Sequence, residues 1–344
     1  MPSHQTNHYY HQNKAKKVAV VTHASKGIGK TVALEFVRAG YTVIINDISE
    51  QDLDQTTKEI LLSLPPDTRN KSNMNNYISS ISNYVTCFPG DISKENISIS
   101  LMEETIKRFG RIDTLINNAT ISQQSIASQS YEMSVAAATN ADDNASTKYQ
   151  KGGQFSPFFT LEEYEIMDTS LKGIYFCIRE LVKQLLVYKN LNSDGTISRH
   201  DGKHYIDNIG RVECSIINIA SSHNSIPSSL ADAYSFSQSG IDPFISSRSG
   251  IKSLTESVAL QLADKGIRVN AIAPGIIDSD ISNELLKDKE KKDQVEHAIP
   301  FQRIGQAQEV AKVALFLASE ASSYVTGTMI YSDGGLSLRD SRSH

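Results

Sequence analysis

One stretch decides the fold of this chain: Ser215-Ile216-Ile217-Asn218-Ile219-Ala220-Ser221. Its apolar residues follow one another with little polar alternation, which is typical of a strand buried on both faces of a parallel sheet. Other short apolar runs have the same character, and they span residues 18–21, 42–46, 84–88, 114–116, 268–272 and 328–331. The sequence therefore predicts about seven buried parallel strands.

The segments between these runs carry apolar residues at helical spacing. Ile28, Val32 and Phe36 share one helical face, and residues 251–262 and 310–317 form similar faces. Strands that alternate with helices predict an α/β fold of the Rossmann type, a doubly wound parallel sheet with helices on both faces.

Composition excludes several classes of protein. The chain has 344 residues and a net charge of −5, which argues against nucleic-acid binding. No apolar run approaches the ~18 residues of a membrane span, and the polar first residues do not form a secretory signal. The cysteines Cys87, Cys177 and Cys214 have neither metal-ligand nor disulfide spacing. We expect a cytoplasmic protein without a metal site or a membrane partner.

Several stretches interrupt the strand–helix rhythm. The polar segments 64–83, 121–157 and 190–213 lack an apolar face, so we expect long surface insertions there. Removing them leaves one ordinary domain. We predict a disordered tail over residues 1–15, a single domain over residues 16–338 and a second polar tail over residues 339–344.

A glycine-rich turn follows the first predicted strand. Residues 22–29 read Thr-His-Ala-Ser-Lys-Gly-Ile-Gly, and such a turn brings backbone N–H groups and a helix N-terminus against phosphate. The candidate cofactor contacts there are Ser25, Lys26, Gly27, Ile28 and Gly29. Two glycines alone are a weak signal, but their place between a strand and a helix strengthens it.

Asp47 ends the second predicted strand. A carboxylate there accepts hydrogen bonds from ribose hydroxyls and repels a 2′-phosphate, so it favours NAD. Lys26 points the other way, because a cation in the loop could receive that phosphate. We predict NAD as the cofactor, with NADP as the alternative, and a plain strand-end role for Asp47 stays open.

Further segments complete a pattern that resembles the short-chain dehydrogenase/reductase family. Ser221 is followed thirteen residues later by Tyr234. Gly90-Asp91-Ile92, Asn117-Asn118-Ala119 and Pro274-Gly275-Ile276-Ile277 follow later strands, in the order that the family shows. The resemblance implies cofactor contacts at Asp91, Ile92, Asn117, Ala119, Pro274, Gly275 and Ile277.

The resemblance also assigns the chemistry. It implies that Tyr234 is the acid/base and that Ser221 orients the substrate oxygen. In the family a lysine four residues after the tyrosine lowers the pKa of the phenol, but Gln238 stands there in this chain. The sequence contains a near-repeat ten residues on, since residues 234–242 resemble 244–252. We expect residues 238–247 to loop out, which would return Arg248 to the place of the lysine.

Four departures from the family pattern, at His23, Thr120, Ser170 and Gln238, leave two functions open. The first is an NAD(P)-dependent oxidoreductase that interconverts an alcohol, such as a sugar or polyol, and a carbonyl. The second is a non-catalytic member that senses cofactor or serves as a protein scaffold.

Within the family, the chain most resembles glucose 1-dehydrogenase-type enzymes and 3-oxoacyl-carrier-protein reductases. The signals are residues 221–227 and residues 321–335. The resemblance further implies a homodimer or homotetramer, formed through residues 251–262, residues 310–317 and the strand before Asp333.

Overall fold

A computed structural model describes residues 16–64, 84–118, 161–187, 213–220, 243–278 and 289–338. It confirms the doubly wound parallel sheet, whose strand order is β3-β2-β1-β4-β5-β6-β9. The strands are β1 (Val18–Val21), β2 (Thr42–Asp47), β3 (Val85–Pro89), β4 (Thr114–Asn118), β5 (Cys214–Ile219), β6 (Ile267–Pro274) and β9 (Met329–Ser332). A separate parallel pair consists of β7 (Ile277–Asp278) and β8 (Gly305–Gln306).

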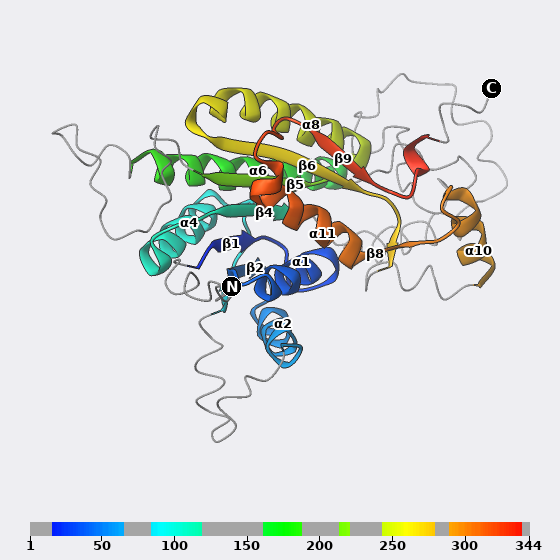
Figure 1. Cartoon of the computed structure of the whole chain (residues 1–344), viewed down its shortest axis with the longest axis horizontal. Helices are drawn as coiled ribbons and strands as arrows, with labels where there is room; N and C mark the ends of the chain where they lie inside the picture. The colour runs from blue at the N-terminus through cyan, green and yellow to red at the C-terminus, as the bar shows by residue number, and fades with distance from the viewer. Residues whose placement is uncertain are drawn as a thin grey trace, which may run out of the picture.

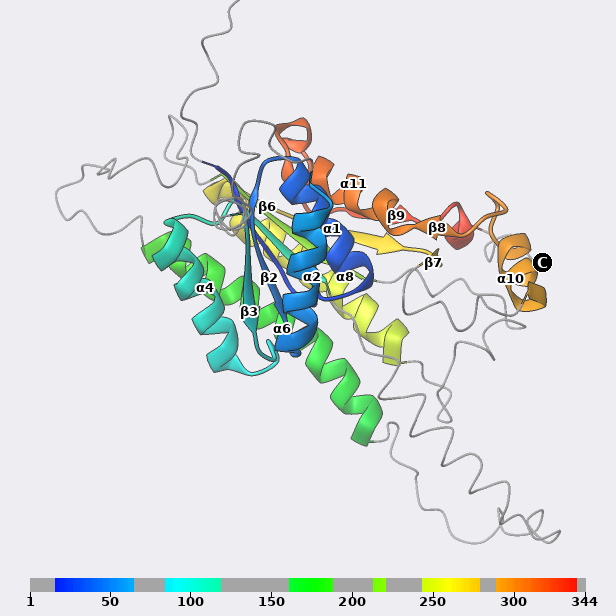
Figure 2. The same ribbon diagram turned by 90° about the horizontal axis from the view of Figure 1, so that it is seen from below.

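Helices cover both faces of the sheet (Figures 1 and 2). They are α1 (Gly27–Arg38), α2 (Glu50–Leu62), α4 (Glu95–Phe109), α6 (Leu161–Val187), α8 (Pro243–Leu262), α10 (Lys289–Ala298) and α11 (Ala307–Ala318). Helices α1 and α11 pack together on one face, while α4, α6 and α8 line up on the other. Across the described segments, no helix combines the length and the apolar character that a membrane crossing needs.

Strand β1 shows why the apolar runs lack polar alternation. Ala19 and Val21 belong to the core beneath α1 and α11, whereas Val18 and Val20 belong to the core beneath α4 and α6. All four side chains are buried. A strand covered by helices on both sides has no wet face, so its sequence is apolar throughout.

The expected loop over residues 238–247 is wrong for its last five residues, because helix α8 begins at Pro243. Proline suits the first position of a helix, since its fixed φ is already helical and its missing N–H would have no partner there. Residues 238–242 lie outside the described segments, as do residues 65–83, 121–157 and 190–212 and both tails.

The sheet order reverses at β1. Strand β1 pairs with β2 on one side and with β4 on the other. Chain connections therefore leave the carboxyl ends of these strands in opposite directions. In open α/β sheets, ligands bind in the crevice expected at such a switch point.

Candidate functional site

The glycine-rich loop lies at the crevice and is tied to both neighbouring strands. Thr22 N donates to Ile116 O on β4 at 3.0 Å, and Ala24 N donates to Asn46 O on β2 at 2.9 Å. Helix α1 then begins at Gly27, without a side-chain cap and without an acidic residue in its first turn. An N-terminus of this kind presents N–H groups and positive potential, which fits a pyrophosphate.

Gly29 is required by a close backbone approach. A Cβ atom at this position would lie 2.4 Å from His23 O and 2.6 Å from Asn118 Nδ2. The same two neighbours are joined, because Asn118 Nδ2 donates to His23 O at 2.9 Å. The backbone of the loop, the start of α1 and the Asn118 side chain at the end of β4 are thus packed around one glycine.

His23 adopts a backbone conformation that favours glycine. Its φ is 47°, in the left-handed region, which costs an ordinary residue roughly 1–2 kcal/mol. Histidine is one of the few residues that enter this region with some frequency. Its Nδ1 atom is buried and has no hydrogen-bond partner. Burial lowers the pKa of the imidazole, although Asp47 and Asp91 act in the opposite direction.

Asp47 anchors the loop to the end of β2. Its Oδ2 accepts from Ser25 N at 3.1 Å and from Ser25 Oγ at 2.6 Å, while its Oδ1 accepts from Ile48 N at 2.8 Å. An ionised carboxylate offers roughly four acceptor sites, so about one remains after these three bonds. Asp47 can therefore hold the loop and still accept one hydrogen bond from a ribose hydroxyl.

Lys26 and Ile28 are less buried than the residues beside them. The Lys26 side chain is about half exposed and pairs with Asp52 on α2. Ile28 is half-buried and packs against the core beneath α1 and α11. Of the five predicted loop contacts, Ser25, Gly27 and Gly29 are buried.

Asp91 and Ile92 follow β3 and have structural partners of their own. Asp91 Oδ1 accepts from Ser93 N at 2.9 Å and from Ser93 Oγ at 2.7 Å, which closes a tight turn. The Ile92 side chain is only 3% exposed and packs in the core beneath α4 and α6. Contact of these two residues with a cofactor remains a prediction.

Asn117 belongs to a buried chain of hydrogen bonds that sequence reasoning missed. Its Nδ2 donates to Asn218 Oδ1 at 2.9 Å, and Asn218 Nδ2 donates to Thr255 Oγ1 at 2.9 Å. The chain joins β4, β5 and α8, and all three side chains are buried. The available signal was Asn218 itself, a polar residue inside an otherwise apolar strand.

Among the described residues, three of five buried side-chain atoms without a hydrogen-bond partner lie at this edge of the sheet, and the other two, Thr86 Oγ1 and Thr114 Oγ1, lie near the starts of β3 and β4. His23 Nδ1, Asn46 Oδ1 and Asn117 Oδ1 are buried and without partners, and they lie at or just beyond the carboxyl ends of β1, β2 and β4. Buried polar atoms are nearly always hydrogen-bonded, so such a group calls for an explanation. Together with the uncapped α1 N-terminus, they fit a site that receives a polar cofactor.

Pro274 is the last residue of β6, Gly275 follows it, and Ile277 is the first residue of β7. A Cβ atom on Gly275 would lie 2.7 Å from Asp333 Cα, and Gly275 N donates to Ser332 O at 3.0 Å. Ile277 is 8% exposed and packs in the core. Packing already explains the glycine, so its contact with a cofactor remains a prediction.

Of the predicted catalytic residues, the described segments include only Arg248. Ser221, Tyr234 and Ala119 lie outside the described segments. Arg248 lies on α8, four residues after Phe244. The structure thus assembles the loop and strand ends of the predicted cofactor side and leaves the catalytic assignments as predictions.

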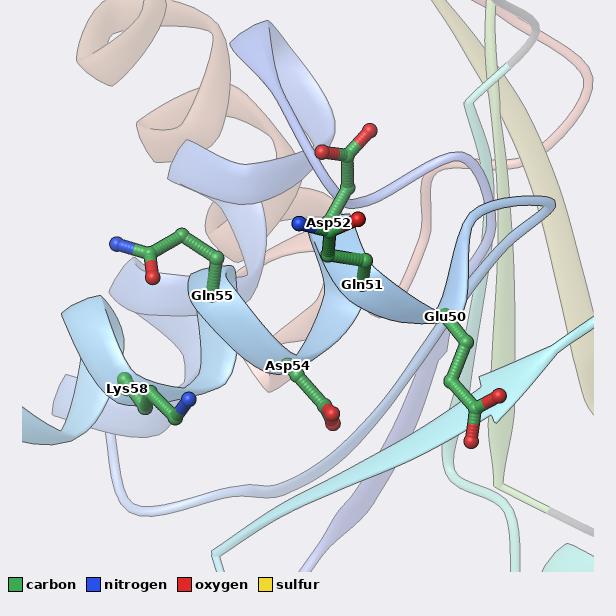
Figure 3. A pocket seen from close by; sticks show the side chains of 6 residues that line it. All are labelled: Glu50, Gln51, Asp52, Asp54, Gln55 and Lys58. Carbon is green, nitrogen blue, oxygen red and sulfur yellow. The ribbon is translucent and has the colours of Figure 1, made fainter.

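A hollow lies on α2, the helix whose Asp52 contacts the glycine-rich loop. Figure 3 shows its lining, and all six residues come from that one helix. They are Glu50, Gln51, Asp52, Asp54, Gln55 and Lys58. A hollow that a single helix lines has no groups converging from a second element, so we do not include it in the candidate site.

Known proteins resemble this chain over nearly its whole length. Glucose 1-dehydrogenase 2 of Bacillus subtilis is 28% identical over 327 residues, which cover 95% of this chain and 96% of that protein. The 3-oxoacyl-(acyl-carrier-protein) reductase FabG of Staphylococcus epidermidis is 27% identical, with coverage of 93% and 98%. The family model described as enoyl-(acyl carrier protein) reductase matches residues 196–337.

Solved structures share the fold. Levodione reductase superposes with a TM-score of 0.63 at 22% identity, covering 95% of this chain and 99% of that one. ElxO with NADP bound superposes with a TM-score of 0.62 at 24% identity, covering 93% and 98%. The sheet order, the glycine-rich loop and these matches together show that the chain is similar in sequence and fold to proteins of the short-chain dehydrogenase/reductase family.

Proposed function

We propose that the protein is an NAD-dependent oxidoreductase that interconverts an alcohol and a carbonyl. The observation that carries the proposal is the uncapped N-terminus of α1, reached through a glycine-rich loop at the carboxyl edge of the sheet. The relatives named above, a glucose dehydrogenase and oxoacyl reductases, support the same class of chemistry. A sugar or polyol is the substrate class that the first of them favours.

The described residues would hold the cofactor in a simple way. The first turn of α1 would bind the pyrophosphate, and the remaining acceptor site of Asp47 would bind an adenosine ribose hydroxyl. The nicotinamide, when bound, supplies hydride transfer. NADP remains the alternative cofactor, and the NADP-bound ElxO structure is a relative in fold that carries it.

The proposed proton chemistry uses Tyr234, Ser221 and Arg248. A tyrosine transfers a proton near neutral pH only if its pKa falls from about 10, and a neighbouring cation lowers it. Arg248 would supply the charge, but a guanidinium holds its proton too firmly to relay one. We therefore expect slow turnover with an alkaline optimum.

One observation favours the second function, a non-catalytic member of the family. Helix α8 begins at Pro243, so Phe244 and Arg248 stand on it four residues apart, as the family's tyrosine and lysine do. Phenylalanine has no proton to give. If this second copy of the motif takes the catalytic place, the protein binds cofactor without performing the reaction.

We also propose a homodimer or homotetramer as the working form. Strand β9 ends the sheet, so its outer edge offers backbone groups for pairing. Aromatic side chains are exposed nearby, since Phe316 on α11 and Tyr331 on β9 are 41% and 47% exposed. Leu260 on α8 is also exposed.

The first prediction concerns cofactor binding. NADH titrated into the protein should show saturable binding by fluorescence, and Gly29→Ala should weaken it at least tenfold, because the new Cβ displaces His23 O. Gly40→Ala is the control. Gly40 has a φ of 90°, so alanine there costs stability, but it lies at the other end of α1 and should keep NADH affinity. The proposal fails if neither NADH nor NADPH binds saturably.

The second prediction separates the two functions. One variant deletes residues 238–247 and adds Arg248→Lys, which places Tyr234 four residues before a lysine. The other variant is Phe244→Tyr with Arg248→Lys, in the helical register of α8. If Tyr234 is the acid/base, the deletion variant should gain about tenfold in turnover, or ~1.4 kcal/mol of barrier. Tyr234→Phe should then abolish the activity of the unmodified chain.

A gain in the Phe244→Tyr variant alone would show that the second copy holds the catalytic place. No gain in either variant, with NADH still bound, would support the non-catalytic function.

The third prediction is a dependence of stability on pH. The pKa of His23 is lowered in the folded protein, so below about pH 6.5 the unfolded chain binds a proton that the folded chain does not. Folding stability should fall as the pH drops through this window, by up to about 1.4 kcal/mol per pH unit, until the folded-state pKa is reached. His23→Asn, which tolerates the same backbone, should remove that part of the slope.

Urea unfolding of both proteins at about pH 7.5 and about pH 5.5 makes the comparison, since the other titrating groups are common to both. Parallel pH profiles for the two proteins would show that His23 contributes nothing to the slope.

The fourth prediction is the oligomeric state. Light scattering at micromolar concentration should give the mass of a dimer or tetramer, and Leu260→Asp or Tyr331→Asp should shift it toward the monomer, because a charge opposes apolar burial. Lys265→Asp, on the polar 3-10 helix that follows α8, is the control. A monomer in the unmodified protein would contradict the proposed assembly.

A further inference from the structure

The cation of the glycine-rich loop is held by a carboxylate of the next helix. Lys26, the residue that precedes α1, places its Nζ 2.9 Å from Asp52 Oδ2 on α2. Both side chains are partly exposed, at 53% and 39%. Lys26 is the residue that a 2′-phosphate on the adenosine ribose would need, so its partner bears on which cofactor the protein accepts.

Helix α2 keeps the carboxylate in place. Ser49 caps the helix, and its Oγ accepts from Asp52 N at 3.2 Å. A carboxylate in the first turn of a helix is favoured by the positive potential there. The hydrogen bond from Lys26 is the main cause that lowers the pKa of Asp52.

Two further contacts fasten α2 to the loop and the start of α1. Thr56 Oγ1 donates to Ser25 O at 2.5 Å, and Lys30 forms an ion pair with Glu59. Each lies one or two turns along α2 from Asp52 and on the side that meets α1. Asp52 and Lys26 are therefore held at contact distance by the packing of two elements, and not by their own attraction alone.

We propose that Asp52 is a cofactor-selectivity residue, which makes the protein prefer NAD by keeping Lys26 paired and unavailable to a 2′-phosphate. This inference rests on the cofactor binding proposed above. A 2′-phosphate that approached Lys26 would have to displace the carboxylate, and it would meet a second one on Asp47. NAD, with a hydroxyl in that place, meets neither obstacle.

The expected size of the change in NADPH affinity follows from the solvent exposure of Lys26 and Asp52. Solvent and salt screen an ion pair whose partners are partly exposed, so the pair shifts a preference without making it absolute. Removing the charge of Asp52 should free Lys26 and also remove a repulsion. Both changes act on NADPH, whereas NADH carries no 2′-phosphate to respond to them.

The test compares dissociation constants for NADH and NADPH, measured by fluorescence at fixed, low salt. Asp52→Asn should strengthen NADPH binding about tenfold and change NADH binding less than about twofold. Asp54→Asn is the matched control, with the same charge change two residues on. Figure 3 shows Asp54 and Asp52 on different sides of α2, and Asp54 lies near Cys87 of β3, where, after burial, it helps to raise the pKa of that thiol.

The double variant Lys26→Ala with Asp52→Asn completes the design. It should lose most of the NADPH gain, because the freed cation is then absent. An equal gain in Asp54→Asn would overturn the proposal, since the effect would then come from net charge. A full gain in the double variant, whose net charge equals that of the unmodified protein, would also overturn it, since Lys26 would then not be the group that receives the phosphate. Unchanged NADPH binding in Asp52→Asn overturns it as well. If the unmodified protein binds neither cofactor, the proposed function itself has failed, and that outcome is distinct from the others.

Discussion

The close packing of the loop backbone and the Asn118 side chain against Gly29 is the constraint on which the candidate site depends. The loop after β1, the first turn of α1 and the end of β4 meet there with no room for a side chain, and Asn118 joins them by its bond to His23 O. This contact ties the start of α1 to the carboxyl end of β4. His23, whose carbonyl takes part in it, lies in the left-handed region with its side chain half-buried. His23 leaves its Nδ1 unpartnered, and burial lowers the pKa of its imidazole.

A second constraint is that two carboxylates hold the glycine-rich loop. Asp47 and Asp52 each have a partner from the loop, Ser25 for the first and Lys26 for the second. Sequence alone places an acid at the end of β2 beside a cation in the loop and leaves the preference between NAD and NADP open. The tertiary contact between the loop and α2 pairs that cation with Asp52, and this pairing is the basis of the proposed preference for NAD.

The repeated motif, residues 234–242 and 244–252, has two copies, and both cannot present the same helical face. Residues on an α-helix advance by about 100° each, so a copy ten residues away cannot present the same face as the first unless some residues leave the helix. Helix α8 contains the second copy from Pro243 onward, with Phe244 and Arg248 in the spacing of an acid/base and its partner. The buried bond from Asn218 to Thr255 pins this helix to β5 and sets its rotation. Whether Tyr234 reaches the same place decides between enzyme and cofactor-binding protein.

The sequence by itself determined the sheet, its strands and the loop at the crevice. Buried parallel strands must be apolar throughout, helices must show period 3.6, and a glycine-rich turn between them is a local feature, so each can be recognised from neighbouring residues. The tertiary structure alone decided the pairing of Lys26 with Asp52, the amide chain from Asn117 to Asn218 and the contact that requires Gly29. These join residues 26, 101 and up to 89 positions apart, and no local pattern encodes a distance between such residues. Their closeness follows from which strands lie side by side and how the helices pack on them, which is settled only when the whole chain has folded.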